Sequence, residues 1–270
     1  MRDNLRAMAA ETMAIIAAGR YRSPGGRDVE LGASVRAAVA GTRLYRPGEV
    51  MPAPVPDDPA APTTAVTNET SLAAARRLGA GAACLVFASA KHPGGGFLSG
   101  AQAQEESIAR ASALYPCQQA ASEFYDYHRR QGDLRYSDRV IYSPGVPVFR
   151  GDDGALLDEP YPVSFITAAA PNLGAILANQ PAAAAGVPAV LAARAERVLA
   201  VAAAHGHREL VLGAWGCGVF RNDPAVVAAT FAGCLARARG LFDHVVFAVL
   251  DHQRGRPALT AFARALSPVR

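Results

Sequence analysis

Several patterns that mark other classes of protein are missing from this 270-residue sequence, and each absence narrows its function. The four cysteines, Cys84, Cys117, Cys217 and Cys234, are widely spaced and form no Cys-x-x-Cys pair, which argues against a disulfide framework and a zinc site. No apolar stretch reaches about 18 residues without charges, so we expect no membrane span. The N-terminal residues carry Glu11 within an amphipathic pattern, unlike a signal peptide. We therefore expect a reduced, cytoplasmic protein without a metal.

The charge pattern argues against a nucleic-acid partner but does not identify the substrate. No run of five or six basic residues is present, so we expect no direct nucleic-acid partner. The net charge is +4 at pH 7, and a mildly basic surface helps an anionic substrate to approach. A solvated surface with a slight excess of arginine explains this charge equally well. Charge alone therefore does not identify the ligand.

The first forty residues contain signals for short, local elements. An amphipathic helix is expected at the start, with Asp3 or Asn4 as its cap. Ser23-Pro24-Gly25-Gly26 predicts a hairpin turn between two short strands, and a short helix is expected over 33–41. Such small elements indicate an accessory region in front of a larger domain.

Six prolines between residues 47 and 62 mark a boundary in the chain. This density excludes a regular helix or a central strand, so the segment is expected to be an extended connection. We therefore divide the chain into an N-terminal accessory extension, residues 1–62, and a main domain, residues 63–270. A domain of that length is large enough to bury a single core.

Short apolar runs alternate with helical patterns throughout the main domain. The expected strands are 63–67, 83–88, 163–169, 209–212 and 244–250, and the expected helices are approximately 71–78 with Thr70 or Ser71 as cap, 103–114, 118–130, 187–205 and 224–239. Continuous apolar strands are typical of a sheet that is covered on both faces. The alternation therefore predicts a mostly parallel sheet between layers of helices.

A glycine-rich loop directly follows the apolar strand that ends at Ala88. Gly94, Gly95 and Gly96 are consecutive, and each glycine costs backbone entropy on folding. One glycine would be enough for a plain turn between strand and helix. Three leave a bare backbone whose N–H groups can meet phosphate or ribose oxygens. Because ligands in α/β proteins bind beyond the carboxyl ends of strands, this loop is a candidate site.

Two adjacent carboxylates, Glu105 and Glu106, open the helix that follows this loop. Acidic residues in a first turn are favoured by the helix dipole, which is a sufficient structural explanation. The preceding loop, however, places them at a cleft. Neighbouring residues on a helix point about 100° apart, so one can act on a scissile bond while the other holds a hydroxyl group. That division suits glycosidic chemistry, in which a carboxylic acid protonates the leaving oxygen.

A second glycine-rich loop, Gly213 to Asp223, follows the strand at 209–212 and precedes another helix. Asp223-Pro224 is a good cap and first-turn pair, and a diphosphate fits where backbone N–H groups and a helix N-terminus converge. Cys217 is not expected to be a nucleophile, because no histidine partner is evident. Trp215 is expected to pack in the core, although stacking on a ligand is the alternative.

Two further residues near these loops have ambiguous roles. Arg221 either adds positive charge for a diphosphate or is simply solvated. Asn172, which follows the strand at 163–169, is expected to cap the next helix.

Taken together, these segments resemble the signature of the poly(ADP-ribose) glycohydrolases. Gly94-Gly95-Gly96, seven further residues and Gln104-Glu105-Glu106 match the motif of that family, and the stretch from Phe87 to Pro93 looks like its compact bacterial branch. Gly216 to Phe220 is similar to the Gly-x-Gly-x-Phe element of macrodomain diphosphate loops. Ser89 stands where macrodomain relatives often have an asparagine.

The resemblance implies a three-layer α/β/α macrodomain with a mostly parallel mixed central sheet and a short N-terminal extension. It implies hydrolysis of ribose–ribose bonds in poly(ADP-ribose), with release of ADP-ribose and without a cofactor or metal. Glu106 falls on the acid/base and Glu105 on the residue that positions the ribose. The implied substrate contacts are Gly94, Gly95, Gly96, Phe97, Gln104, Gly216, Cys217, Gly218, Val219 and Phe220. The implied ligands are poly(ADP-ribose) and ADP-ribose, bound by a monomer.

Two other functions fit the same residues. One is a macrodomain that only binds ADP-ribose, although such a reader needs no acid at Glu106. The other is a hydrolase that removes single ADP-ribose units from protein or nucleic acid. The motif favours the polymer hydrolase.

Overall fold

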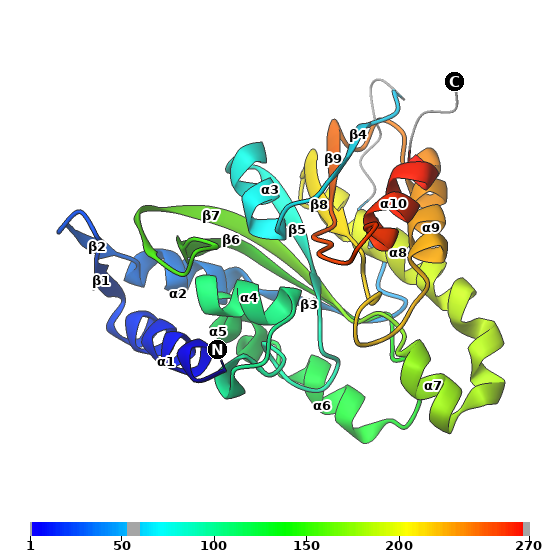
Figure 1. The fold of residues 1–270 in the computed structure, drawn as a ribbon, viewed down its shortest axis with the longest axis horizontal. Coiled ribbons are helices and arrows are strands. Elements are labelled where there is room, and N and C mark those ends of the chain that lie inside the picture. Colours follow the sequence, from blue (N-terminus) through cyan, green and yellow to red (C-terminus); the bar gives the residue numbers. More distant parts are fainter. Residues whose placement is uncertain (1, 53–59, 267–270) are drawn as a thin grey trace.

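The computed structural model describes residues 2–52 and 60–266 (Figure 1). Its strands are β1 (Arg20–Arg22), β2 (Asp28–Glu30), β3 (Arg43–Tyr45), β4 (Thr63–Thr67), β5 (Ala82–Phe87), β6 (Val140–Arg150), β7 (Leu156–Ala168), β8 (Glu209–Gly213) and β9 (His244–Ala248). Its helices are α1 (Arg2–Ala18), α2 (Gly32–Gly41), α3 (Ser71–Leu78), α4 (Gln104–Ala111), α5 (Leu114–Ala120), α6 (Glu123–Arg130), α7 (Leu173–Asn179), α8 (Val187–Ala204), α9 (Pro224–Arg237) and α10 (Pro257–Leu266). Two 3₁₀ turns, η1 (Phe97–Ser99) and η2 (Pro181–Gly186), complete the list.

A seven-stranded sheet in the order β3-β6-β7-β5-β8-β9-β4 forms the centre of the molecule. The five strands from β7 to β4 are parallel to one another, whereas β6 is antiparallel to both of its neighbours. This arrangement confirms the expected mostly parallel mixed sheet. Parallel neighbours end at the same edge of the sheet, so β7, β5 and β8 deliver their following loops to one place.

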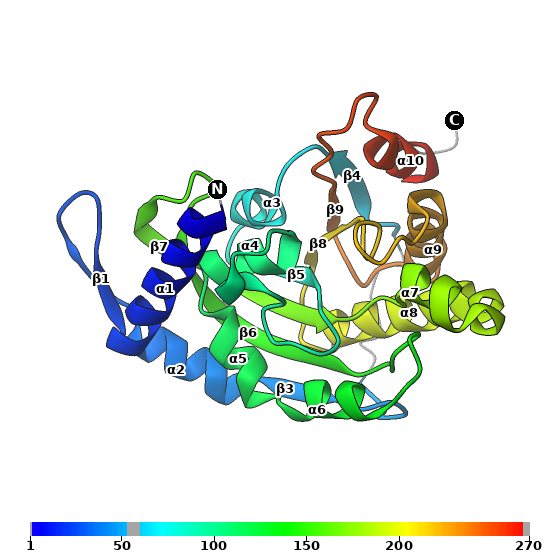
Figure 2. The ribbon, with the colours of Figure 1, turned by 60° about the horizontal axis from the view of Figure 1, so that its bottom comes forward.

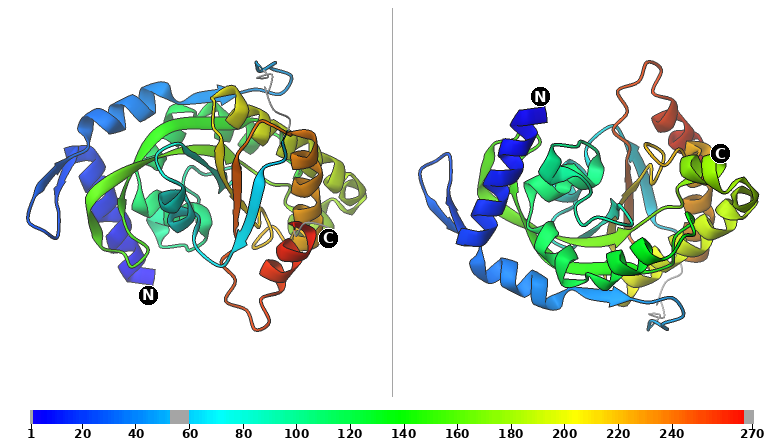
Figure 3. Two further views of the ribbon diagram at one scale, coloured as in Figure 1. Left: turned by 90° about the horizontal axis from the view of Figure 1, so that it is seen from above. Right: turned by 90° about the horizontal axis from the view of Figure 1, so that it is seen from below.

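Helices cover both faces of the sheet, as the apolar strands predicted. On β5, Ala83 and Leu85 face the core beneath α7 to α10, while Cys84 and Val86 face the core beneath α1 to α5. Figure 1 shows these two helical layers on opposite sides of the strands, and α1 and α10 lie far apart in both views of Figure 3. Because successive side chains of a strand point to opposite faces, both sets must be apolar. The three-layer α/β/α fold is confirmed.

The N-terminal region is packed against the sheet and contributes to it. Strand β3 pairs with β6 at one edge, and Ile15 of α1 and Val35 of α2 are buried in the core on that side. The hairpin β1–β2 stands away from the body beside the start of β7 (Figure 2), where the Tyr21 hydroxyl donates to the Leu157 carbonyl at 2.5 Å. The division of the chain at residue 62 stays a prediction. Part of its proline-rich connection, 53–59, lies outside the described residues.

Three polar residues cap helices as the sequence suggested. The Thr70 hydroxyl accepts from the Ala73 N–H and therefore caps α3 in preference to Ser71. Asn172 caps α7 and Asp223 caps α9 through their side-chain oxygens. The expected cap of α1 was wrong, because the helix already includes Arg2 and places Asp3 within its first turn.

Some predicted boundaries were also wrong. The pattern predicted two helices, 103–114 and 118–130, but the structure has three, α4 to α6. Helix α4 ends at Ser112, which is extended and bridges to Val148, and a second break at Ala121 and Ser122 divides the predicted second helix. Strand β6 was not predicted at all, since it contains Pro144 and Pro147 and bends at a register shift between Ser143 and Val146. Within residues 2–52 and 60–266, no helix is long and apolar enough to cross a membrane.

Candidate active site

The two ends of the first glycine-rich loop and the second glycine-rich loop meet at one cavity of about 270 Å³ beyond the ends of β5 and β8. These strands are neighbours in the sheet, so the loops after Phe87 and Gly213 leave it side by side. The cavity is lined by Phe87, Ala88, Ser89, Ala103, Gln104, Glu105, Glu106, Ala170, Ala214, Trp215, Gly216, Gly218, Val219 and Phe220. Segments more than a hundred residues apart in the sequence thus form a single site. The predicted contacts Gly94, Gly95 and Gly96 do not line the cavity and support Glu106 from behind.

The first glycine loop adopts a conformation that only glycine tolerates well. Gly94 and Gly95 have positive φ angles of 64° and 58°. A Cβ atom at Gly95 would collide with Oε1 of Glu106 and lie 3.2 Å from Oε2 of Glu105. The bare backbone therefore allows both carboxyl groups to approach the loop, which explains why one glycine would not suffice.

Glu106 is partly exposed in the first turn of α4 and lines the cavity. Its Oε1 atom accepts a hydrogen bond from the Gly96 N–H at 3.0 Å. The loop thus holds one carboxyl oxygen of Glu106 in place. A fixed carboxyl group beside a bare backbone can transfer a proton to or from a bound ligand.

Glu105 lies next to Glu106 in sequence but in a different environment. Its side chain is 2% exposed, and Oε2 accepts from the Ser89 N–H at 2.6 Å. Oε1 accepts from the side-chain amide of Gln118 at 3.0 Å. Burial raises the pKa of Glu105 to about 8, partly opposed by these hydrogen bonds and increased by the neighbouring Glu106. The two carboxyl groups therefore differ in exposure and in hydrogen-bond partners.

Gln118 of α5 is a site residue that sequence reasoning missed. Its amide is fully buried, and its oxygen accepts from the Gly94 N–H at 2.6 Å while its nitrogen donates to Glu105. One side chain thus connects the glycine loop to the buried carboxyl group. No local signal identified it, because it lies on a different helix and joins the loop only in the folded chain. Ser89 was noted only for its position in the sequence. In the structure, its backbone N–H donates a hydrogen bond to the carboxyl group of Glu105.

Gln104 and Phe97 have roles other than those their positions suggested. Gln104 lines the cavity, but its amide accepts from the Phe87 N–H at 2.9 Å and donates to the Leu85 carbonyl at 2.8 Å. It therefore holds α4 to the end of β5. Phe97 is fully buried beneath the loop and does not line the cavity, so the structure does not bring this residue to the ligand side.

The second loop is shaped by Gly216 and Asn222. Gly216 has a φ of 72°, and a Cβ atom there would lie 2.5 Å from the Asn222 amide nitrogen. That nitrogen donates to the Pro171 carbonyl at 2.9 Å and to the Gly216 carbonyl at 3.2 Å. Asn222 is buried and was not predicted as a site residue. At the tip, Val219 is 83% exposed, so an apolar side chain faces the solvent beside the cavity.

The other side chains of this loop either pack in the core or line the cavity, and Trp215 does both. Trp215 is buried, as expected, and its indole N–H donates to the Ala168 carbonyl at 3.0 Å while its surface lines the cavity. Phe220 lines the cavity too, and its ring lies 6.0 Å from that of Tyr136. Burial raises the pKa of the Cys217 thiol to about 12, which keeps it protonated near neutral pH.

A larger cavity of about 900 Å³ adjoins the first and shares with it Phe87, Ala103, Gln104, Ala214 and Gly218. It extends past Cys217 to the first turn of α9 and to the loop after β9. The buried Asp251 lies in that loop and accepts from the N–H groups of Gln253 and Ala258, at the start of α10. We refer to the two adjoining cavities together as the groove, and Glu106 lines only the smaller one.

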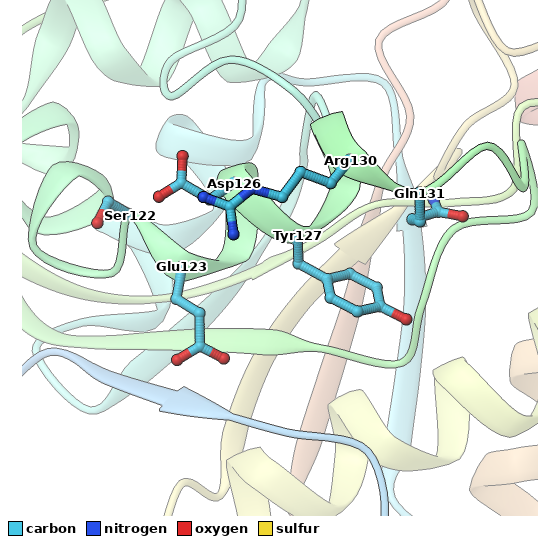
Figure 4. Close-up of a pocket in the computed structure, with 6 residues that line it drawn as sticks. All are labelled: Ser122, Glu123, Asp126, Tyr127, Arg130 and Gln131. Atoms are coloured by element: carbon cyan, nitrogen blue, oxygen red, sulfur yellow. The ribbon is translucent and has the colours of Figure 1, made fainter.

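A separate hollow lies on the outer surface of α6 (Figure 4). The side chains of Glu123 and Tyr127 extend from the same side of this helix, and Arg130 reaches back towards Asp126. It shares no lining residue with the groove. Glu123 forms an ion pair with Arg46, so its charge is already matched. In the part of the chain that the structure describes, no cluster of three or more His, Cys, Asp or Glu could hold a metal ion.

Comparisons with known proteins agree on one family. A family model described as microbial-type PARG, catalytic domain, matches residues 9–151. The crystal structure of poly(ADP-ribose) glycohydrolase from Thermomonospora curvata is 53% identical, with a TM-score of 0.91 over 98% of this chain and 100% of that one. The enzyme from Deinococcus radiodurans in complex with ADP-ribose is 46% identical, with a TM-score of 0.82 over 90% of this chain and 100% of that one. A search of curated proteins found no match.

Proposed function

Since the chain belongs to the family of microbial-type poly(ADP-ribose) glycohydrolases, we propose that it hydrolyses the ribose–ribose O-glycosidic bonds of poly(ADP-ribose) and releases ADP-ribose. The observation that carries this proposal is the position of Glu106. Its carboxyl group is fixed by the Gly96 N–H and lines the groove opposite residues of the second glycine loop. A protein that only bound ADP-ribose would not need a carboxyl group there.

The groove suggests how the terminal ADP-ribose unit binds. We assign the diphosphate to the backbone of Gly216, Cys217, Gly218 and Val219, beside the N-terminus of α9. The ribose next to the scissile bond then lies between this loop and the first glycine loop, flanked by Phe220. The nucleoside enters the larger cavity of about 900 Å³, which has room for it.

The proposed reaction needs Glu106 and one water molecule. Glu106 gives its proton to the ribose oxygen that leaves, as the anomeric carbon gains oxocarbenium character. The same carboxylate then takes a proton from the water that attacks this carbon, which restores the acid. Glu105 does not face the leaving oxygen in this scheme. Its carboxyl group, held by Ser89 and Gln118, fixes the ribose hydroxyls.

The test is Glu106→Gln, which keeps the shape of the side chain but replaces the carboxyl group with an amide that cannot donate or accept the catalytic proton. Release of ADP-ribose from the polymer is expected to fall by about 10³-fold or more, because general acid and base catalysis are both lost. The affinity for ADP-ribose should stay within a few-fold of the parent. The matched control is Glu30→Gln, which changes an exposed glutamate on β2, outside the groove. Turnover close to that of the parent would refute the role of Glu106.

The two other functions give different results with two substrates. The parent chain and the Glu106→Gln variant are each incubated with poly(ADP-ribose) and with a mono-ADP-ribosylated protein. Release from the polymer alone supports the proposed function. Release from the mono-modified protein alone indicates the mono-ADP-ribose hydrolase, and binding without any release indicates a reader.

The setting of the enzyme is also a proposal. We propose that it acts as a monomer in the cytoplasm and has no direct nucleic-acid partner. The free thiols of Cys84, Cys117, Cys217 and Cys234 support a reducing compartment.

A further inference from the structure

The first turn of α1 contacts the loop that precedes α4 (Figure 1). The Nε atoms of Arg2 and Arg6 both donate to the Ser99 carbonyl oxygen, at 3.1 and 3.0 Å. Two guanidinium groups thus share one backbone acceptor at the end of the glycine loop. Charged donors make stronger hydrogen bonds than neutral ones.

Packing beneath the loop reinforces this contact. Phe97 is fully buried against Ala9 of α1 and Ala109 of α4, with its ring 5.0 Å from that of Tyr115. Gly100 has a φ of 77°, and a Cβ atom there would lie 2.6 Å from the Arg2 carbonyl oxygen. The backbones of the loop and of α1 therefore approach as closely as a glycine allows.

Only a few bonds separate Ser99 from the carboxyl group of Glu106. The N–H and hydroxyl of Ser99 donate to the Gly96 carbonyl at 3.0 and 2.9 Å, and the Ala101 N–H donates to the same oxygen at 3.1 Å. The Gly96 N–H in turn donates to Oε1 of Glu106 at 3.0 Å. A shift of Ser99 would therefore move the group that fixes Glu106.

The rest of α1 is anchored without the two arginines. The Thr12 hydroxyl donates to the Arg110 carbonyl at 2.6 Å, Glu11 pairs with the buried Arg150 at 2.8 Å, and Ile15 lies in the core. These contacts fix the helix on the body of the protein. Its first turn can then hold the loop against a fixed support.

We propose that Arg2 and Arg6 are positioning residues for the reaction and form a clamp, defined as their two hydrogen bonds to the Ser99 carbonyl. The clamp keeps the Gly96 N–H on Glu106 and so aims the acid at the scissile bond. This inference rests on the proposed role of Glu106. It gives α1 a part in catalysis although no residue of the helix lines the groove.

The test replaces both arginines at once. In Arg2→Ala/Arg6→Ala, kcat on poly(ADP-ribose) is expected to fall by about tenfold, since small misplacement of a catalytic group has large effects on rate. KM should change by less than about twofold, because binding groups are untouched. ADP-ribose affinity, followed by the fluorescence of the single tryptophan, Trp215 in the cavity wall, should equal that of the parent. Arg2→Lys/Arg6→Lys should recover part of the rate, since lysine also donates to a carbonyl.

The matched control is Arg22→Ala/Arg27→Ala in the hairpin β1–β2. It removes the same two charges from exposed arginines, whose ion pairs with Asp28 and Glu159 lie away from the loop. An unchanged kcat in the clamp variant would overturn the inference, as would an equal loss of kcat in the control. If the double variant unfolds at the assay temperature, the single variants Arg2→Ala and Arg6→Ala decide the question. A parent chain inactive on the polymer would refute the proposed function on which the clamp rests.

Discussion

Glu105 and Glu106 illustrate how two identical neighbours acquire different properties. Both line the cavity, but Glu106 is partly exposed and bound by the Gly96 N–H, whereas Glu105 is buried and bound by the Ser89 N–H and the Gln118 amide. The helical period places adjacent side chains about 100° apart, so separate environments follow from sequence adjacency. The sequence thus predicted a division of labour, but it did not predict that Glu105 would be the buried one.

The buried carboxyl group of Glu105 should reduce stability as the pH rises. Its pKa is raised from 4.5 to about 8, so between these values the folded chain binds more protons than the unfolded chain. The free energy of unfolding therefore falls with rising pH in this window. Glu105→Gln removes the group, and we expect its stability relative to the parent to increase by roughly 3 kcal/mol between about pH 5 and pH 8.

Urea unfolding at both pH values, followed by circular dichroism, measures this difference. Glu30→Gln serves as the control, because Glu30 is exposed on β2. A Glu105→Gln variant with the same relative stability at both pH values would contradict the raised pKa.

At the scale of single residues, the sequence motifs identified the functional residues that lie within them, but not the residues elsewhere in the chain that support them. Glu106 and the three glycines were identifiable because they belong to one short stretch of sequence with an unusual composition. Gln118 and Asn222 were not, since each makes its contacts to backbone groups that approach only after folding. The family resemblance placed Phe97 among the substrate contacts, whereas the structure buries it beneath the glycines.

At the scale of elements, the first glycine loop depends on backbone geometry more than on side chains. Gly95→Ala places a methyl group at a φ of 58° and against Glu106. We expect kcat to fall by about 100-fold, because the carboxyl group must move. Steady-state kinetics on the polymer measures the loss. Gly132→Ala is the control, since a Cβ atom there has open space. Equal rates in both variants would show that the loop tolerates a side chain.

The predictability of elements followed the clarity of their patterns. Strands β5, β8 and β9 were predicted within one or two residues, because each is a short apolar run between helices. Strand β6 was missed because prolines interrupt it, although Pro144 lies in the register shift between Ser143 and Val146, and Pro147 is paired with Pro162 of β7. The bounds of α4 to α6 were wrong, because α4 ends where Ser112 bridges to Val148, a contact distant in sequence, and the predicted helix 118–130 spans the end of α5 and all of α6.

At the scale of the whole molecule, the predicted extension and the main domain share one sheet and one core. A chain of residues 63–270 would lose β3 from the edge of β6. It would also expose the apolar surface beneath Ile15, Leu31 and Val35, which are buried in the core with α3 and α4. Each such side chain contributes about 1.5–3 kcal/mol when buried. We therefore expect the shortened chain to unfold at much lower urea concentration or without cooperativity.

Urea unfolding of the shortened and full chains compares them directly, and a chain of residues 1–266 controls for truncation as such. A shortened chain with the midpoint of the full one would support an independent domain beginning at residue 63. The general architecture was predictable because it depends on the alternation of apolar strands and helices. The attachment of the N-terminal region was not, since β3 has three residues and no clear pattern.

The origin of the groove in two neighbouring strands has a consequence for synthesis on the ribosome. Strand β5 and Glu106 emerge early, but β8, which pairs beside β5 and carries the second loop, emerges about a hundred residues later. Until then the nascent chain contains the proton donor without the wall that would hold a nucleotide against it. Chains that stop before β8 therefore lack nearly half of the cavity wall, and the complete site forms only in the last quarter of translation.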